Sequence, residues 1–133
     1  MIVFGYPHLR SPRFRHIRTS ADIATSGNDE IVWFYAREDR EFALLGHCVS
    51  YEIPCAVRVE EVLDFVLCAS FKPTYLIIES SPATYQAIAE NYMLDSKLLC
   101  LITHEGQIAA LAQEGIDGVI FESWLEGARY PAR

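Results

Sequence analysis

Short apolar runs rich in β-branched and aromatic residues recur along the chain at nearly constant intervals. Consecutive runs begin 20 to 24 residues apart, which leaves room for one crossover helix between neighbouring strands. Strands joined in this way run parallel, and near-continuous apolar character indicates that both faces of each strand are buried. The five runs are Ile31–Tyr35, Cys55–Val59, Tyr75–Ile78, Leu98–Ile102 and Gly118–Phe121.

The segments between these runs carry apolar residues at helical spacing. Ser81 before Pro82 is typical of a helix start, Thr103 can cap the following helix, and Gly115 is suited to end it. One face of each helix should pack on the sheet. The expected inward side chains are Phe42, Leu45 and Val49 within 39–50; Val62, Val66 and Ala69 within 60–70; Tyr85, Ile88 and Tyr92; and Ile108, Leu111 and Ala112.

This alternation predicts an α/β fold, and 133 residues suffice for one core, so we expect a single domain over 1–133. The expected architecture is a three-layer α/β/α domain, flavodoxin-like or Rossmann-like, with a mainly parallel sheet of five to six strands. The regular repeats cover 31–123, and 1–18 forms an arm with a short edge strand at 2–4. A half-barrel would use the same strands, and the pattern leaves both strand orders open.

Charge is unevenly distributed along the chain. The net charge is −7, yet residues 1–18 hold four arginines and no acid. The acidic remainder would repel phosphate, so we expect the arm to fold onto its own domain or a second subunit, and we expect no nucleic-acid partner. A protein partner or self-association would use the aromatic residues outside the regular repeats, which could equally close the ends of the sheet. They are Phe4, Tyr6, Trp124 and Tyr130.

Other composition features narrow the class of protein. The apolar runs are far shorter than the roughly 18 residues of a membrane span, and the first residues do not read as a signal peptide. We therefore expect a cytoplasmic protein with no membrane contact. The four cysteines form no CxxC pair, so we expect free buried thiols, no disulfide, no metal site and no cofactor. They are Cys48, Cys55, Cys68 and Cys100.

Polar residues follow each predicted strand, and the carboxyl ends of parallel strands are where α/β folds bind ligands. Carboxylates there suit a divalent cation, although acids are also favoured at helix N-termini without any ligand. His104 could act as a general base only with a hydroxyl such as Ser80 or Ser81 nearby. The candidate ligand-edge residues are Glu38, Asp39, Glu79, Ser80, Ser81, Thr103, His104 and Glu122.

Several nucleotide and hydrolase motifs are missing from the sequence. No GxSxG elbow, GxGxxG loop or GxxxxGK[ST] loop occurs, so neither a serine hydrolase nor a classical dinucleotide or nucleoside triphosphate site is indicated. No catalytic residue can be named from the sequence.

Within 53–123, the segments Lys72–Pro82, Leu98–His104 and Ala112–Phe121 together resemble the receiver domain of bacterial response regulators. Lys72–Pro82 is similar to strand 3 and its following loop, Leu98–His104 to strand 4 with its switch hydroxyl at Thr103, and Ala112–Phe121 to the passage into strand 5. The resemblance implies an acidic pair, an acceptor aspartate and a lysine. In this chain Tyr35 and Ala36 stand at the positions of the acidic pair. Glu79 stands at the position of the acceptor aspartate, and Glu122 or Ser123 at the position of the lysine.

Two functions follow from these observations. The first is a non-enzymatic, receiver-like interaction or regulatory module that cannot carry out phosphoryl transfer. The alternative is an enzyme that binds a small molecule or a metal at the carboxyl edge of the sheet, with Glu79, Thr103, His104 and Glu122 in one pocket.

Overall fold

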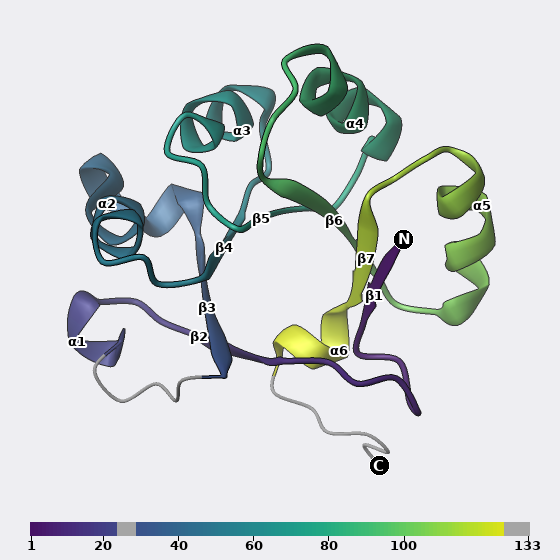
Figure 1. Cartoon of the computed structure of the whole chain (residues 1–133), viewed down its shortest axis with the longest axis horizontal. Coiled ribbons are helices and arrows are strands. Elements are labelled where there is room, and N and C mark those ends of the chain that lie inside the picture. The colour runs from purple at the N-terminus through teal and green to yellow at the C-terminus, as the bar shows by residue number, and fades with distance from the viewer. Residues whose placement is uncertain (24–28, 127–133) are drawn as a thin grey trace.

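The computed structural model describes residues 1–23 and 29–126, in which seven parallel strands form one sheet. The sheet curls into a half-barrel with helices α2 to α5 around its outside (Figure 1). The elements are β1 Ile2–Phe4, β2 Arg13–His16, α1 Ser20–Ile23, β3 Glu30–Tyr35, η1 Ala36–Glu38, η2 Arg40–Phe42, α2 Ala43–Ser50, β4 Cys55–Arg58, α3 Val62–Ala69, β5 Tyr75–Ile78, α4 Pro82–Asn91, β6 Lys97–Ile102, η3 Glu105–Gln107, α5 Ile108–Gln113, β7 Gly118–Phe121 and α6 Glu122–Leu125.

The parallel α/β class is confirmed, and the five expected strands lie within one residue of their predicted bounds. The layering differs from expectation, because the strand order is β1-β7-β6-β5-β4-β3-β2. From β2 to β7 each strand pairs with the next one in the chain, so right-handed crossovers place all their helices on the same face. With the helices on one face only, the sheet curls so that its uncovered face is concave (Figure 1). The sheet is therefore a seven-stranded half-barrel, not the middle of three layers.

Two separate hydrophobic clusters correspond to the two faces of the curled sheet. The outer cluster joins strand residues to helices α2 to α5. The inner cluster is built from strand side chains together with Leu125 and Trp124 of α6. Rings fill the concave interior, where Phe4 lies 5.5 Å from both Phe14 and Tyr75 between ring centroids. The concave side is thus a packed core.

Residues 1–18 supply both edges of the sheet. β1 pairs with β7, where Ile2 lies opposite Gly118, and β2 pairs with β3. The arm therefore folds onto its own domain, which is one of the two arrangements expected from the sequence. Figure 1 shows α6 in the gap between β7 and β2, and Trp124 Nε1 donates to Pro12 O at 2.8 Å.

The aromatic residues outside the repeats mainly serve this closure. Phe4 and Trp124 pack with the inner cluster, and Tyr6 lies 6.1 Å from the Phe121 ring. Tyr130 lies outside the described residues. The positions of Phe4, Tyr6 and Trp124 support the expectation that these residues close the ends of the sheet, rather than the alternative that they contact a partner.

Helix α3 faces the sheet with a different side from the predicted one. Phe65, Cys68 and Ala69 are buried, whereas Val62 and Val66 are 44% and 45% exposed. Because α3 is apolar on most of its circumference, periodicity alone does not select a face. The inward side is the one that buries its phenylalanine, whose ring lies 4.9 Å from that of Tyr85. The other expected inward residues that are exposed are Val49, Tyr92 and Ala112.

Other expectations concern the cysteines, the last helix and membrane contact. All four cysteines are free and buried, and burial raises the pKa of Cys68 to about 12. Gly115, with φ 78°, ends α5, and α6 is four residues long. Within 1–23 and 29–126, no helix combines the length and apolar character needed to cross a membrane.

Candidate functional site

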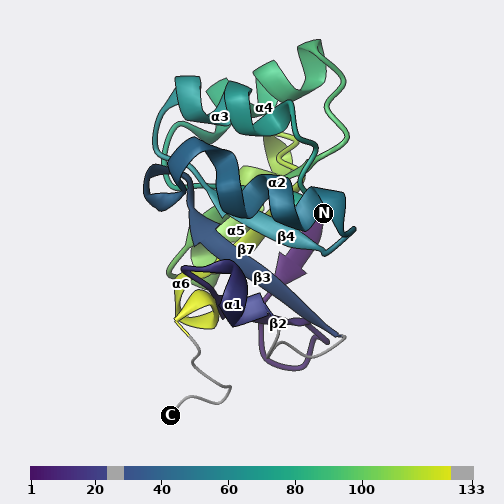
Figure 2. The ribbon, with the colours of Figure 1, turned by 90° about the vertical axis from the view of Figure 1, so that its left-hand side faces the viewer.

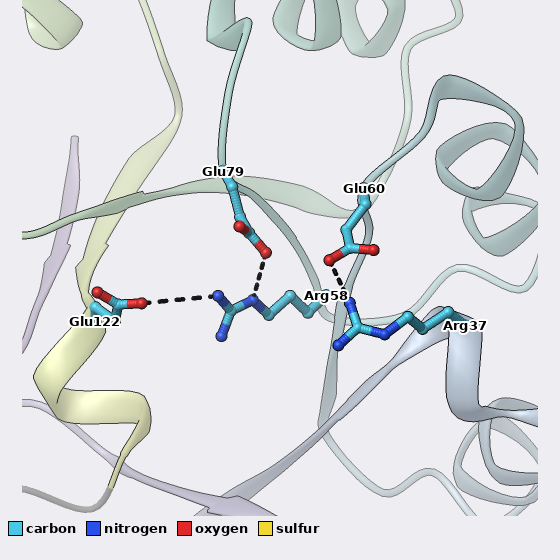
Figure 3. A network of polar contacts seen from close by, with 5 residues as sticks. All are labelled: Arg37, Arg58, Glu60, Glu79 and Glu122. Carbon is cyan, nitrogen blue, oxygen red and sulfur yellow. Dashed lines mark hydrogen bonds and ion pairs between the residues drawn. The ribbon is translucent and has the colours of Figure 1, made fainter.

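Arg58 lies at the centre of the carboxyl edge of the sheet. It ends β4, it is 9% exposed, and its side chain extends across the mouth of the half-barrel. Arg58 Nε donates to Glu79 Oε2 at 2.8 Å, and Nη2 lies 3.9 Å from Glu122 Oε2 (Figure 3). Glu79 follows β5 and Glu122 begins α6 after β7. One guanidinium thus joins three segments, and its charge is balanced by two carboxylates.

The aromatic rings of Tyr35 and Trp33 lie beside this arginine. The Arg58 guanidinium carbon lies 5.0 Å from the centroid of Tyr35 and 5.9 Å from that of Trp33, within the range of cation–π attraction. His16 of β2 stacks on Trp33 with ring centroids 4.2 Å apart. Two buried ring nitrogens, His16 Nε2 and Trp33 Nε1, have no hydrogen-bond partner within 1–23 and 29–126. Buried polar atoms of this kind are uncommon in folded proteins.

A second arginine–carboxylate pair lies farther out at this edge. Arg37 Nη1 donates to Glu60, and both side chains are about half exposed. The Arg37 guanidinium also lies 4.4 Å from the centroid of Tyr35. An exposed pair of this kind contributes little to stability, because solvent screens its charges.

Two of the other predicted edge residues, Asp39 and His104, cap the starts of helical segments. Asp39 accepts hydrogen bonds from the backbone N–H groups of Leu44 and Leu45 at 2.7 and 3.0 Å, at the start of α2. Ser81 occupies the N-cap position of α4 with φ 53°, but its side chain makes no capping bond. Capping explains Asp39 without a ligand, as electrostatics at a helix start would predict.

His104 caps the turn η3 in place of Thr103. His104 Nδ1 accepts from Gly106 N at 2.9 Å, and Gln107 Oε1 accepts from Thr103 N and His104 N. Within the described ranges, these hydrogen bonds tie His104 to its own loop, and none joins it to Ser80 or Ser81. The geometry required for a histidine base beside a serine is therefore not present.

Two small cavities lie at this edge. One, of about 220 Å³, is lined by Glu79 and Ser80, with Val59, Glu60 and Tyr85. The other, of about 340 Å³, contains Glu38 and Asp39 and is lined further by Arg18, Thr19, Ser20, Arg40, Ala43, Leu44 and His47. The predicted edge residues are thus divided between separate places. Among residues 1–23 and 29–126, no group of three His, Cys, Asp or Glu side chains is arranged to hold a metal ion.

Sequence reasoning missed Arg58, His16 and Trp33. Arg58 did have a signal, because it is a charged residue inside a run otherwise expected to be buried, and such a residue requires a partner. His16 and Trp33 meet only because β2 pairs with β3 in a register that sets them side by side. That register is a property of the tertiary fold.

A second candidate surface lies on the helical, convex side. Of the ten exposed large hydrophobic side chains in the described part of the chain, eight lie on or directly after α2, α3 and α4. These helices are consecutive neighbours on the outer surface (Figures 1 and 2). We call this surface the convex apolar face; its residues are Val49, Tyr51, Val62, Leu63, Val66, Leu67, Tyr92 and Met93.

Comparison with known proteins assigns no family. No protein-family model matches the chain, and no curated protein matches it. Of the resemblance to receiver domains, the structure supports the parallel α/β architecture.

We expect His16, at the mouth of the half-barrel, to make the stability of the fold depend on pH. Burial lowers the pKa of His16 from 6.5, and the positive charge of Arg18 lowers it further. The unfolded chain then binds this proton more readily than the folded chain, so unfolding becomes easier as pH falls through about 6.5. We expect the free energy of unfolding to decrease between pH 7.5 and pH 5.5, measured by urea denaturation.

His16→Gln should reduce that decrease, because glutamine does not titrate. Each variant is compared only with itself at the two pH values, so the lost stacking on Trp33 cancels. An equal decrease in the wild type and His16→Gln would show that other groups cause it.

Proposed function

We propose that this chain is a non-enzymatic α/β interaction module that acts through protein contact at the convex apolar face and does not carry out phosphoryl transfer. The observation that carries the proposal is the concentration of exposed apolar side chains on three neighbouring helices. Large exposed apolar patches are rare on monomeric proteins and commonly mark protein contacts, and a concentration of exposed apolar side chains on neighbouring helices favours such a patch. Four free buried thiols support a reducing compartment such as the cytoplasm.

The arrangement at the carboxyl edge argues against phosphoryl transfer. In the receiver comparison, Glu79 stands at the acceptor position, and here its carboxylate accepts from Arg58. The position of the lysine corresponds to Glu122 or Ser123, and Glu122 also faces Arg58. A phosphoryl group would therefore meet carboxylates without the metal-binding acidic pair. The comparison with receivers supports a regulatory role only through its general architecture.

Cross-linking from one position tests the contact directly. A photoreactive phenylalanine analogue at Leu63, 63% exposed on α3, is compared in cells with the same group at exposed Ala109 on α5. We expect one defined cross-linked protein species from position 63 that disappears when Val66→Glu is added. Equal cross-linking from both positions, or none from position 63, would contradict the proposal.

The arginine at the mouth favours a second candidate function, the binding of a small anion. Among the described residues, Arg58 Nη1 has no hydrogen-bond partner and Nη2 has only the 3.9 Å contact to Glu122. A guanidinium edge with free donors suits a carboxylate or phosphate. Trp33 Nε1 lies on β3, the strand next to β4, and His16 Nε2 lies on β2, one strand farther; neither has a hydrogen-bond partner among the described residues. An enzyme using this edge would begin from such binding.

Tryptophan fluorescence tests this second candidate. The chain has two tryptophans, so Trp124→Phe leaves Trp33 as the sole reporter beside Arg58. Titration with inorganic phosphate or citrate should give a saturable signal that Arg58→Met abolishes. A signal that does not saturate, or that persists in Arg58→Met, would exclude this site.

A further inference from the structure

Helix α3 carries apolar side chains on its outer side in a repeated pattern. Val62 and Leu63 recur one turn later as Val66 and Leu67, with exposed fractions of 44%, 63%, 45% and 41%. The opposite side of the same helix is buried against the sheet. In Figure 1, α3 lies between α2 and α4 on the outside of the half-barrel. A helix that is apolar on both sides is typical of one that packs on both sides.

The two ends of α3 differ in charge. Glu60 and Glu61 precede the helix, where Arg37 offsets only Glu60. Beyond the other end stands Lys72, whose side chain is 72% exposed and 3.8 Å from Asp95. The amino end is therefore acidic, and the carboxyl end offers an exposed ammonium group.

We propose that the occupant of the convex apolar face is a second copy of this chain, with α3 packed antiparallel on α3 of the partner about a two-fold axis. This inference rests on the proposed function and names the partner. The axis passes the helix midway between Val62 and Leu67. Each valine then faces a leucine of the other copy, Val62 opposite Leu67 and Leu63 opposite Val66. Such pairing of larger with smaller side chains is self-complementary, as a two-fold interface requires.

The charges favour the antiparallel direction over the parallel one. Parallel pairing would set two acidic amino ends together and match valine with valine. Antiparallel pairing brings the acidic end of each helix toward Lys72 of the other copy and aligns the helix dipoles favourably. Like charges brought together would cost stability, so orientation is selected electrostatically.

The flanking helices supply the breadth that an interface needs. A standard protein interface buries about 800 Å² on each partner, more than one face of an eight-residue helix offers. Tyr51 beyond α2 is 69% exposed, and Tyr92 and Met93 beyond α4 are 75% and 85% exposed. Tyrosine and methionine are enriched in interface centres. In the proposed dimer these side chains, which follow the helices on either side of α3, would add to the contact.

Disulfide trapping in the purified chain tests both the partner and the direction. All four native cysteines are buried, so a cysteine introduced on the surface is the accessible thiol. A tagged Val62→Cys chain is mixed with an untagged Leu67→Cys chain under mild oxidation by oxidised glutathione, which is reduced as the disulfide forms. We expect the mixed disulfide to exceed both like pairs, and to exceed the yield from exposed Ala109→Cys at least tenfold.

Ser70→Cys reports the orientation. In the antiparallel arrangement two copies of this residue lie about 16 Å apart along the helices, so no disulfide forms, whereas parallel pairing would join them. A strong Ser70→Cys dimer, or a Val62→Cys and Leu67→Cys mixture no better than Ala109→Cys, would overturn the inference. If the mixed disulfide fails but position 63 cross-links to a different protein, the proposed function stands and only the pairing of two copies is rejected. If neither the mixed disulfide nor a cross-link from position 63 forms, the pairing and the proposed function are both rejected. Circular dichroism verifies that each variant is folded.

Discussion

Phe65→Ala should lower the free energy of unfolding by about 3 to 5 kcal/mol, because it empties a fully buried position. Phe65 is 0% exposed, it anchors α3 to the outer face of the sheet, and its ring lies 4.9 Å from that of Tyr85. The loss combines the transfer energy of the ring with the cavity left between helix and sheet. Urea denaturation monitored by circular dichroism measures the change.

Leu63→Ala is the matched control on the same helix. Leu63 lies two residues earlier but is 63% exposed, so its truncation should change the stability of the separate chain by less than about 0.5 kcal/mol. The comparison requires a protein concentration at which copies do not pair, because pairing would add stability. Similar losses for both variants would mean that α3 is oriented differently on the sheet.

Gly118→Ala should be the most damaging single-atom change at the closure of the sheet, with a loss of about 2 to 3 kcal/mol. A Cβ at Gly118 would lie 2.7 Å from Ile2 Cβ and 2.9 Å from both Ile2 O and Leu99 Cδ2. These atoms belong to β1 and β6, which flank β7. The added methyl group must push β1 away, so we expect a lower melting temperature and faster amide exchange at Ile2 to Phe4.

Gly46→Ala provides the opposite expectation. Gly46 lies inside α2, and no atom would come within 4 Å of an added Cβ. Alanine should then stabilise the fold by about 0.5 to 1 kcal/mol through helix propensity. A neutral or stabilising effect at Gly118, or a loss at Gly46, would contradict the described packing of these two glycines.

The strands were predictable because their signal is local. Runs such as Tyr75–Ile78 combine β-branched and apolar residues with breakers at each end, and their parallel direction follows from the spacing. The curl was not predictable from that spacing. It depends on strand order, and both open sheets and half-barrels use the same βα repeats. The edge positions of β1 and β2 likewise depend on contacts with β7 and β3, far along the chain.

The candidate site was predictable only as a location. Glu79 and Glu122 do converge at the carboxyl edge, but through Arg58, which the pattern treated as part of a buried strand. Asp39 and His104 were assigned to the correct edge, yet their side chains bond to nearby backbone. Which role a polar residue adopts depends on side-chain geometry, and spacing does not contain that information.

The orientation of α3 also could not be predicted from residue spacing. Val62 and Val66 satisfy a helical period, but so do Phe65 and Ala69, and the larger side chain occupies the interior. Val62 and Val66, which the sequence pattern predicts to face the core, are exposed on the surface in the structure. Such exposed apolar residues are the basis of the proposed contact between copies.

Sedimentation equilibrium of the full chain tests this central claim most directly. We expect the wild type and Ala109→Glu to sediment as dimers at micromolar concentration, and Leu63→Glu to sediment as a folded monomer, because a buried unpaired carboxylate opposes pairing. A wild-type chain that remains monomeric up to millimolar concentration, or a Leu63→Glu chain that stays dimeric, would contradict the account.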